Sequence, residues 1–211
     1  MSNQIDIFVS LQYSYDNNTW QEWDGHVINL NAGQKVYIKA LNSNPDGMAY
    51  YDEGMGYVTK YNKFIFEGKI AASGNIQYLL EDTGSRADVP SWCYYEMFYS
   101  CTSLTQAPAL PATTLATECY SYMFYGCTSL TQAPTLPATT LAEYCYFHMF
   151  SDCSSLTQAP ALPATTLADS CYYYMFYNCS KFSDCHMKAN MEGVYNKSTH
   201  GDTTKTVIYD L

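Results

Sequence analysis

The chain has little positive charge, and none in its central part. It has 211 residues and a formal net charge of −10, and neither Lys nor Arg occurs between Arg86 and Lys181. A nucleic-acid-binding surface needs a basic patch to neutralise phosphates, so we expect no nucleic acid partner. The same shortage disfavours an acidic partner or an anionic membrane surface.

Hydrophobic segments of two kinds are also missing. The sequence has no apolar run of membrane-spanning length, so we expect no membrane insertion. The N-terminal segment, "MSNQIDIFVSLQYSYD", lacks the basic region and apolar core of a secretory signal peptide. We therefore expect a protein that is made in the cytoplasm.

Sequence motifs of catalysis are absent as well. The chain has no nucleophile elbow, phosphate-binding loop, EF-hand loop or His-rich metal spacing, and its four histidines are scattered. We expect no catalytic residues, no metal and no cofactor. Acids near aromatics in "YYDEGMG" and "QEWDG" leave a carbohydrate-active enzyme as the third and least favoured function.

The most specific feature that is present is an internal repeat. Cys93, Cys119, Cys145 and Cys171 follow one another at intervals of 26 residues. The text between them is nearly copied: "CTSLTQAPALPATTLA", "CTSLTQAPTLPATTLA" and "CSSLTQAPALPATTLA". A fixed period in the twenties predicts a solenoid, in which each unit covers the apolar face of its neighbour.

The segment "CYSYMFYGC" is interpreted as a short helix. Its spacing then places Cys119, Met123 and Cys127 on one side, with Tyr120 and Phe124 beside them, as a core-facing stripe. Eight helical residues span about 12 Å, too far for two thiolates on one zinc ion. We expect buried, reduced cysteines; disulfides between adjacent repeats and metal binding are the less favoured alternatives.

The segment "LTQAPALP" is interpreted as the strand of each repeat. This predicts a parallel ladder through Thr105, Thr131 and Thr157, shortened by the prolines that follow. Val89 is in register with Leu115, so the repeats are expected to begin before the first cysteine.

The two ends of the chain differ from the repeats. "QIDIFVSLQYSYD", "GHVINL", "KVYIKAL" and "NKFIFEGKI" are predicted strands separated by turns, so residues 1–75 are expected to form a small, sandwich-like antiparallel β domain. The repeats are assigned to residues 76–187. Residues 188–211 are expected to be a C-terminal cap that ends in a strand near Thr204–Tyr209.

The motif Met-Phe-x-x-Cys-x-Ser-Leu, followed by a proline-flanked strand, resembles the BspA-like leucine-rich-repeat proteins. These occur on the surfaces of gut and oral bacteria and in phages that infect them. The resemblance covers about residues 76–187. It implies an α+β fold, a leucine-rich-repeat solenoid of about four 26-residue coils after the β domain, and a non-enzymatic role in adhesion or recognition.

The copies differ from one another at a few positions that carry many tyrosines. Counting each leading cysteine as zero, variation falls mainly at +2, +3, +6 and +7, and at the two residues before the cysteine; these positions centre opposite the Cys-Met-Cys stripe. Tyrosine with Ser, Gly, Asn and Asp is typical of binding surfaces. The candidate ligand-binding residues are Tyr95, Tyr99, Tyr122, Tyr125, His148, Tyr173, Tyr174 and Tyr177.

Two alternatives to this binding surface stay open. Drift after duplication of a Tyr-rich unit would give a similar set of residues. The repeated Thr-Gln pairs at 105–106, 131–132 and 157–158 could instead bind a repeating ligand.

The function expected from these observations is recognition by a phage virion or tail-associated component. The ligand would be a protein or glycan on a host cell surface, or another virion protein, and homo-oligomerisation is left open. A bacterial surface adhesin module is the alternative.

Overall fold

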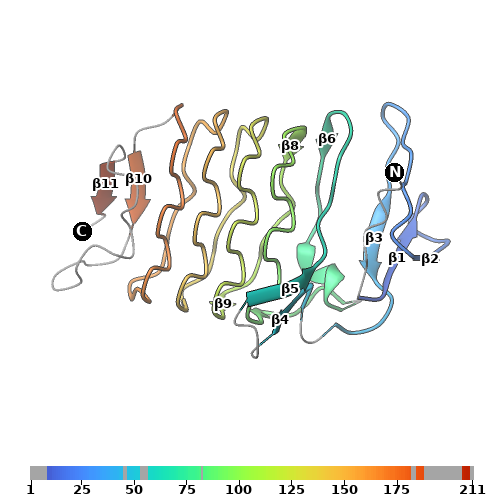
Figure 1. Cartoon of the computed structure of the whole chain (residues 1–211), viewed down its shortest axis with the longest axis horizontal. Helices are drawn as coiled ribbons and strands as arrows, with labels where there is room; N and C mark the ends of the chain where they lie inside the picture. The colour runs from blue at the N-terminus through green and yellow to red at the C-terminus, as the bar shows by residue number, and fades with distance from the viewer. Residues whose placement is uncertain are drawn as a thin grey trace.

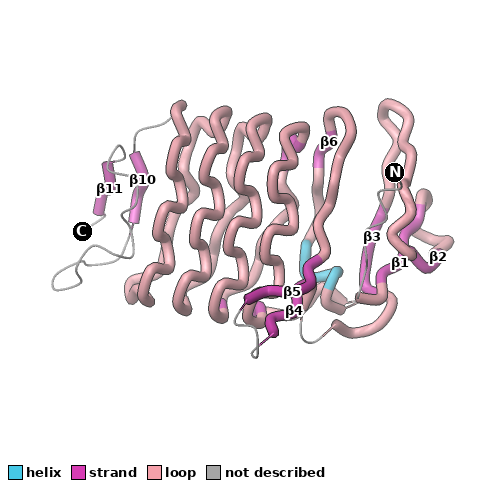
Figure 2. The backbone as a smooth tube through the Cα atoms, viewed as in Figure 1, coloured by secondary structure: helices cyan, strands magenta, loops and turns pink. Residues whose placement is uncertain are grey.

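The computed structural model describes residues 9–44, 47–52, 57–81, 83–181, 184–187 and 206–209. These residues form short β-strands joined by turns and loops (Figure 1 and Figure 2). The one helix among them is the 3₁₀ helix η1 (Ile76–Leu79), and they include no α-helix. The expected α+β leucine-rich-repeat solenoid is therefore wrong as a fold class, because this part of the chain consists mostly of small β-sheets and loops.

The strands are short, and none exceeds five residues. They are β1 (Leu11–Ser14), β2 (Gln21–Trp23), β3 (Tyr37–Ala40), β4 (Ala49–Asp52), β5 (Tyr57–Tyr61), β6 (Ile70–Ala71), β7 (Asp88–Val89), β8 (Leu104–Gln106), β9 (Thr114–Leu115), β10 (Asp184–Met187) and β11 (Thr206–Tyr209). They pair into one three-stranded sheet and four two-stranded sheets.

The 26-residue copies lie side by side in sequence order, between the N-terminal strands and the β10–β11 pair (Figure 1). Backbone hydrogen bonds join each copy to the next. The N–H of Tyr94 donates to the carbonyl of Cys119 at 2.9 Å, and that of Tyr120 donates to Cys145 at 3.0 Å. Each repeat is thus held by the following one through its main chain, which is independent of side-chain identity.

The predicted helix in each repeat is replaced by a chain of overlapping turns. We call residues 90–101, 116–127, 142–153 and 168–179 the turn segments. In each of them every second N–H bonds the carbonyl three residues back, as Met123 does to Tyr120 at 3.2 Å. In the first three segments, the intervening N–H groups donate to the next repeat, as Phe124 does to Met149 at 2.9 Å. The helical prediction is wrong because the N–H groups are divided between these two kinds of bond.

A positive φ angle at every fourth residue makes this path possible. In repeat 2 it falls on Glu118 (52°), Tyr122 (56°) and Gly126 (68°), and the same positions are positive in the other three repeats. A right-handed α-helix has φ near −63° throughout, so it cannot pass through these residues. A positive φ at the third residue of a turn is the sign that type II turns require.

The side chains predicted to be core are buried, although they do not lie on a helix. In repeat 2, Cys119, Met123, Phe124 and Cys127 are 0% exposed, and Tyr120 is 1% exposed. The turn segment sends two residues inward and the next two outward, so positions 0, +1, +4, +5 and +8 face the core. The prediction of buried cysteines is confirmed for the eight whose side chains are described, all of which are free thiols; Cys185 is not among them.

Two columns of stacked rings run through the interior. Tyr94, Tyr120, Tyr146 and Tyr172 are successively 5.5, 5.7 and 5.6 Å apart. Phe98, Phe124, Phe150 and Phe176 are successively 5.3, 5.5 and 5.7 Å apart. Offset stacking of aromatic rings adds to the stabilisation by burial, so neighbouring repeats are joined by side chains as well as by main chain.

The predicted strand ladder through the repeats is wrong. Of the three Leu-Thr-Gln segments, only Leu104–Gln106 forms a strand, β8, and it pairs in parallel with β6 rather than with the next repeat. Thr131 and Thr157 lie outside the strands, joined by a single backbone hydrogen bond of 3.2 Å. Prolines without N–H groups follow closely in each copy and prevent a continuous ladder. The register of Val89 with Leu115 is confirmed by the parallel pair β7–β9.

The N-terminal strands agree with the sequence only in part. β1 lies between β2 and β3 in an antiparallel sheet, and β4 pairs with β5. "KVYIKAL" contains β3 and "QIDIFVSLQYSYD" contains β1, but "GHVINL" forms no strand, and "NKFIFEGKI" contributes only Ile70. The predicted C-terminal strand is confirmed at Thr206–Tyr209, which pairs with β10; residues 204–205 lie outside the described residues.

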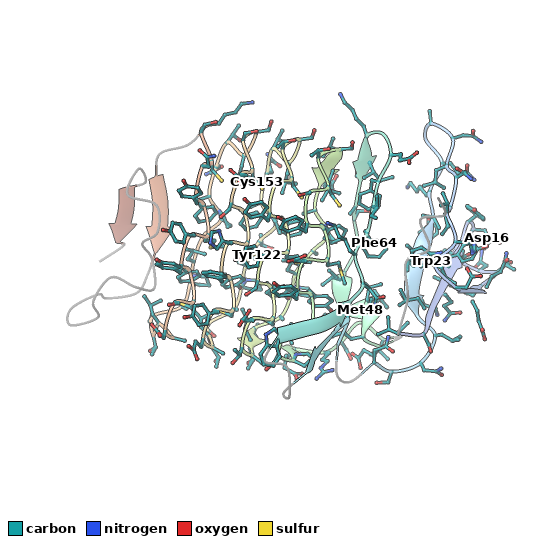
Figure 3. All side chains as sticks on the ribbon, viewed as in Figure 1. Asp16, Trp23, Met48, Phe64, Tyr122 and Cys153 are labelled. Carbon is teal, nitrogen blue, oxygen red and sulfur yellow. The ribbon has the colours of Figure 1, made fainter. Side chains whose placement is uncertain are left out.

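Residues 62–76 pack against repeat 1. The N–H of Phe64 donates to Met97 at 2.8 Å, and that of Ile70 donates to Ser103 at 3.1 Å. The Phe64 ring stacks on Phe98, with ring centroids 5.4 Å apart, and on Trp23, at 6.0 Å. This segment covers the first repeat, and Figure 3 shows Phe64 between the repeats and Trp23.

Candidate binding surface

The outward side chains of the turn segments form one continuous aromatic surface, which we call the aromatic face. It contains all eight residues predicted from the sequence, together with two more rings from the same segments. Its members are Tyr95, Tyr99, Tyr122, Tyr125, Tyr144, Phe147, His148, Tyr173, Tyr174 and Tyr177. Figure 3 shows rings in rows across the repeats, with Tyr122 among them.

The rings of neighbouring repeats stack on one another. Tyr99 and Tyr125 are 4.9 Å apart with planes 5° apart. His148 lies between Tyr122, at 5.0 Å, and Tyr174, at 4.8 Å. A ring inside such a stack has its faces covered, so it presents its edge and hydroxyl to the outside.

Tyr122 lies at the centre of the aromatic face. Besides stacking on His148, it meets Phe147 edge-on at 5.2 Å and Tyr95 edge-on at 6.0 Å. It also contacts Tyr125 at 5.9 Å with planes tilted by 52°. Tyr122 is only half-buried, but it joins rings from three repeats and contributes to packing as well as to the surface.

Serine replaces a ring at two places, and both serines bond the next repeat. Ser121 Oγ donates to the carbonyl of Tyr144 at 2.8 Å, and Ser151 Oγ donates to that of Tyr174 at 2.6 Å. Both side chains are 0% exposed. Since the Ser151 proton goes to Tyr174, His148 Nδ1, 2.8 Å from Ser151 Oγ, is assigned the proton that Ser151 accepts.

The charged groups around the aromatic face are acidic, with one exception. A hydrogen bond to the Asp152 carboxylate raises the pKa of Tyr125 to about 12. Burial raises the pKa of Glu118, and burial lowers the pKa of His148. The exception is Lys63, whose ammonium lies 4.5 Å from the centroid of the Tyr99 ring.

The second candidate surface carries the Thr-Gln pairs. A shallow hollow of about 350 Å³ lies between repeats 2 and 3, lined by Gln132, Pro134, Gln158 and Pro160 among others. Thr131, Gln132, Thr157 and Gln158 are exposed. The hollow is open and has no charged side chain in its lining, so few groups there can hold or orient a ligand.

Within the described ranges, no group of three His, Cys, Asp or Glu side chains is placed to hold a metal ion. In the same part of the chain, no helix is both long enough and apolar enough to cross a membrane.

Comparison with known proteins gives no relative for this chain: no family model, no curated protein and no solved structure matches it. The likeness to BspA-like proteins therefore rests on the repeat motif alone.

Three residues of the surface and its surroundings are not among the candidate ligand-binding residues. Phe147, at position +2, and Tyr144, before the cysteine, lie at positions that vary between the copies, so the variation includes them although the candidate set does not. Lys63 lies 36 residues before Tyr99, outside the repeats, and only the packing of residues 62–76 brings it there.

Proposed function

We propose that this chain is a non-enzymatic recognition protein that binds its partner through the aromatic face. The observation that carries the proposal is the continuity of the outward rings across all four turn segments. Tyrosine is enriched among residues that dominate binding energy, because it offers a large area and a hydroxyl at a low cost in side-chain entropy. Rings that are already stacked lose even less freedom when a partner binds.

The stacking favours a protein partner over a glycan. A sugar ring packs on an open aromatic face, but the faces of Tyr122 and His148 are directed at other rings. Edges and hydroxyls suit hydrogen bonding and edge-to-face contact with the side chains of a protein. A virion or tail-associated setting, or alternatively a bacterial surface, is supported by the resemblance of the repeat motif, and the neighbouring genes would distinguish the two.

The proposal is tested by capture of host cell-surface proteins and glycans on the immobilised chain. Tyr177 is 44% exposed and contacts Tyr174 edge-on, so Tyr177→Ala removes surface with little loss of packing. We expect Tyr177→Ala combined with Tyr173→Ala to weaken capture about thirtyfold, the loss that truncation of a binding hot spot causes.

The matched control is Gln132→Ala combined with Gln158→Ala, which alters the hollow on the other surface. We expect this pair to bind as the unmodified chain does. Loss of binding in the glutamine pair with retention in the tyrosine pair would transfer the function to the Thr-Gln surface. Turnover of an oligosaccharide by the unmodified chain would contradict the non-enzymatic role.

A further inference from the structure

The stack formed by Tyr99 and Tyr125 ends inside the aromatic face. Tyrosine occupies position +6 in repeats 1, 2 and 4, but repeat 3 has Ser151 there. On the repeat 3 side, the Tyr125 ring meets the His148 ring at 6.2 Å and at a tilt of 52°, so the two do not stack. Tyr125 is therefore stacked on its Tyr99 side, and the stack does not continue beyond it.

A carboxylate lies at the rim of this ring. The Asp152 carboxylate acts on the Tyr125 hydroxyl, whose pKa it raises, and it accepts a hydrogen bond from Asn178 Nδ2 at 2.7 Å. Within the described ranges, the two ion pairs are Asp24 with His26 and Asp88 with Arg86, so Asp152 has no cationic partner there. Residues 87–180 contain no Lys or Arg, and among the described residues neither Lys63 nor Lys181 forms an ion pair with Asp152.

The opposite end of the same stack already holds a cation. The Lys63 ammonium lies 4.5 Å from the Tyr99 centroid, on a ring that stacks on Tyr125. A cation over a tyrosine face is attracted by the negative charge of the π system. At the Tyr99 end the chain supplies this cation itself, whereas at the Tyr125 end the nearest charge is the carboxylate of Asp152.

We propose that Tyr125 and Asp152 form a site for an arginine side chain of a protein partner. The guanidinium stacks on the side of the Tyr125 ring that faces repeat 3 and donates hydrogen bonds to the Asp152 carboxylate. Arginine fits better than lysine because its guanidinium is planar, stacks on aromatic rings and carries several donors in a fork that matches a carboxylate. This inference rests on the proposed function, since it names one contact within the aromatic face.

The test measures the affinity of a hexa-arginine peptide and of a hexalysine peptide for the full chain by titration calorimetry at low salt. Asp152→Asn removes the charge, and Asn tolerates the positive φ of this position, which is 59°. Ser151→Tyr continues the stack with the residue that the other three repeats use. Asp169→Asn, at another exposed carboxylate of the turn segments, is the matched control for net charge.

We expect Asp152→Asn and Ser151→Tyr each to weaken hexa-arginine binding about tenfold, the loss of one desolvated cation–π contact with its hydrogen bonds. Asp169→Asn should change it less than about twofold, as loss of a screened surface charge does. Equal effects of the two Asp→Asn changes, or equal binding of hexalysine, would overturn the arginine site.

Two further comparisons keep the outcome decisive. If Ser151→Tyr does not fold, the pair of Asp→Asn variants, which alter only exposed or half-buried carboxylates, still gives the answer. If hexa-arginine binding does not depend on Asp152 while the tyrosine pair still reduces capture of a host protein, only the arginine site fails. The reverse result would contradict the proposed function and leave the arginine site standing.

Discussion

Gly126 lies directly against Ser100 of the preceding repeat. A Cβ atom added to Gly126 would be 3.4 Å from Ser100 Oγ, and the two residues occupy the same position, +7, with φ angles of 68° and 57°. The turn segments therefore require at +7 a conformation that glycine adopts freely and other residues adopt at a cost.

Gly126→Ala should lower the free energy of unfolding by about 1 kcal/mol, because alanine pays for the left-handed conformation. Ser100→Gly should raise the free energy of unfolding. Glycine adopts the left-handed conformation freely, and this gain exceeds the loss from the greater entropy of the unfolded chain. Urea titration followed by circular dichroism measures both. Gly33→Ala is the control for backbone alone, as Gly33 has φ of 81° and open space around it. If Ser100→Gly lowers the free energy of unfolding, the left-handed conformation at position +7 carries no cost for serine.

Tyr122 and Tyr177 should differ in their effects on stability. Tyr122→Ala removes the central ring of the aromatic face and should lower the free energy of unfolding by about 2 kcal/mol, through lost ring contacts. Tyr177→Ala should cost less than about 1 kcal/mol, as surface substitutions usually do. Thermal melts of the two variants test this, and equal melting temperatures would show that the ring cluster contributes nothing.

The cysteines should resist modification in the folded protein. Burial raises the pKa of Cys93 and of Cys101 to about 12, so at pH 8 the reactive thiolate is scarce as well as inaccessible. We expect iodoacetamide to label the eight described cysteines only at the rate of unfolding, and quickly in denaturant. Rapid labelling of Cys119 in the native protein, mapped by mass spectrometry, would contradict the buried position.

Stability should depend on Glu118 near neutral pH. Burial raises the pKa of this carboxyl above its ordinary value of 4.5, so the folded state binds its proton more tightly than the unfolded state does. Its contribution to stability is therefore greatest below pH 4.5 and is lost as pH rises through the folded pKa. Glu118→Gln should raise the melting temperature at pH 7 more than at pH 5.

The control for that comparison is Glu67→Gln, at an exposed carboxylate outside the repeats that does not act on Glu118. This change should give similar shifts at both pH values. No measurement is made below pH 5, because Asp16, whose pKa is lowered by hydrogen bonds from Thr19, loses its stabilising contribution as pH falls below about 4. If Glu118→Gln raises the melting temperature equally at both pH values, burial does not disfavour the ionised form of Glu118.

The sequence was sufficient to predict the core residues and the outward rings of the turn segments, but not the burial of Ser121 and Ser151 or the backbone that arranges them. Cys119, Met123 and Cys127 are four residues apart, and this spacing fits one side of a helix and also a turn segment that repeats every four residues. The positive φ at Glu118, Tyr122 and Gly126 distinguishes the turn segment from a helix. Of these three residues, only Gly126 is of a type that indicates a positive φ.

The surroundings of the aromatic face were less accessible to prediction for a different reason. Positions +2, +3 and +6 recur in each copy, so comparison of copies identified their rings together. Lys63 belongs to a segment without repeats, and no periodicity connects it with Tyr99. Contacts between a repeat and its cap depend on packing of unique sequence, which patterns within the repeats do not encode.

The main-chain bonds between neighbouring repeats have a consequence for how this protein can change over generations. Because the N–H of Tyr120 meets Cys145 as the N–H of Tyr94 meets Cys119, one copy can follow another without any new kind of contact. Unequal recombination within the gene can then add or remove whole 26-residue units and leave both ends of the chain intact. Each event lengthens or shortens the outward surface by one layer, so the number of contacts offered to a partner becomes a heritable quantity that varies in whole steps.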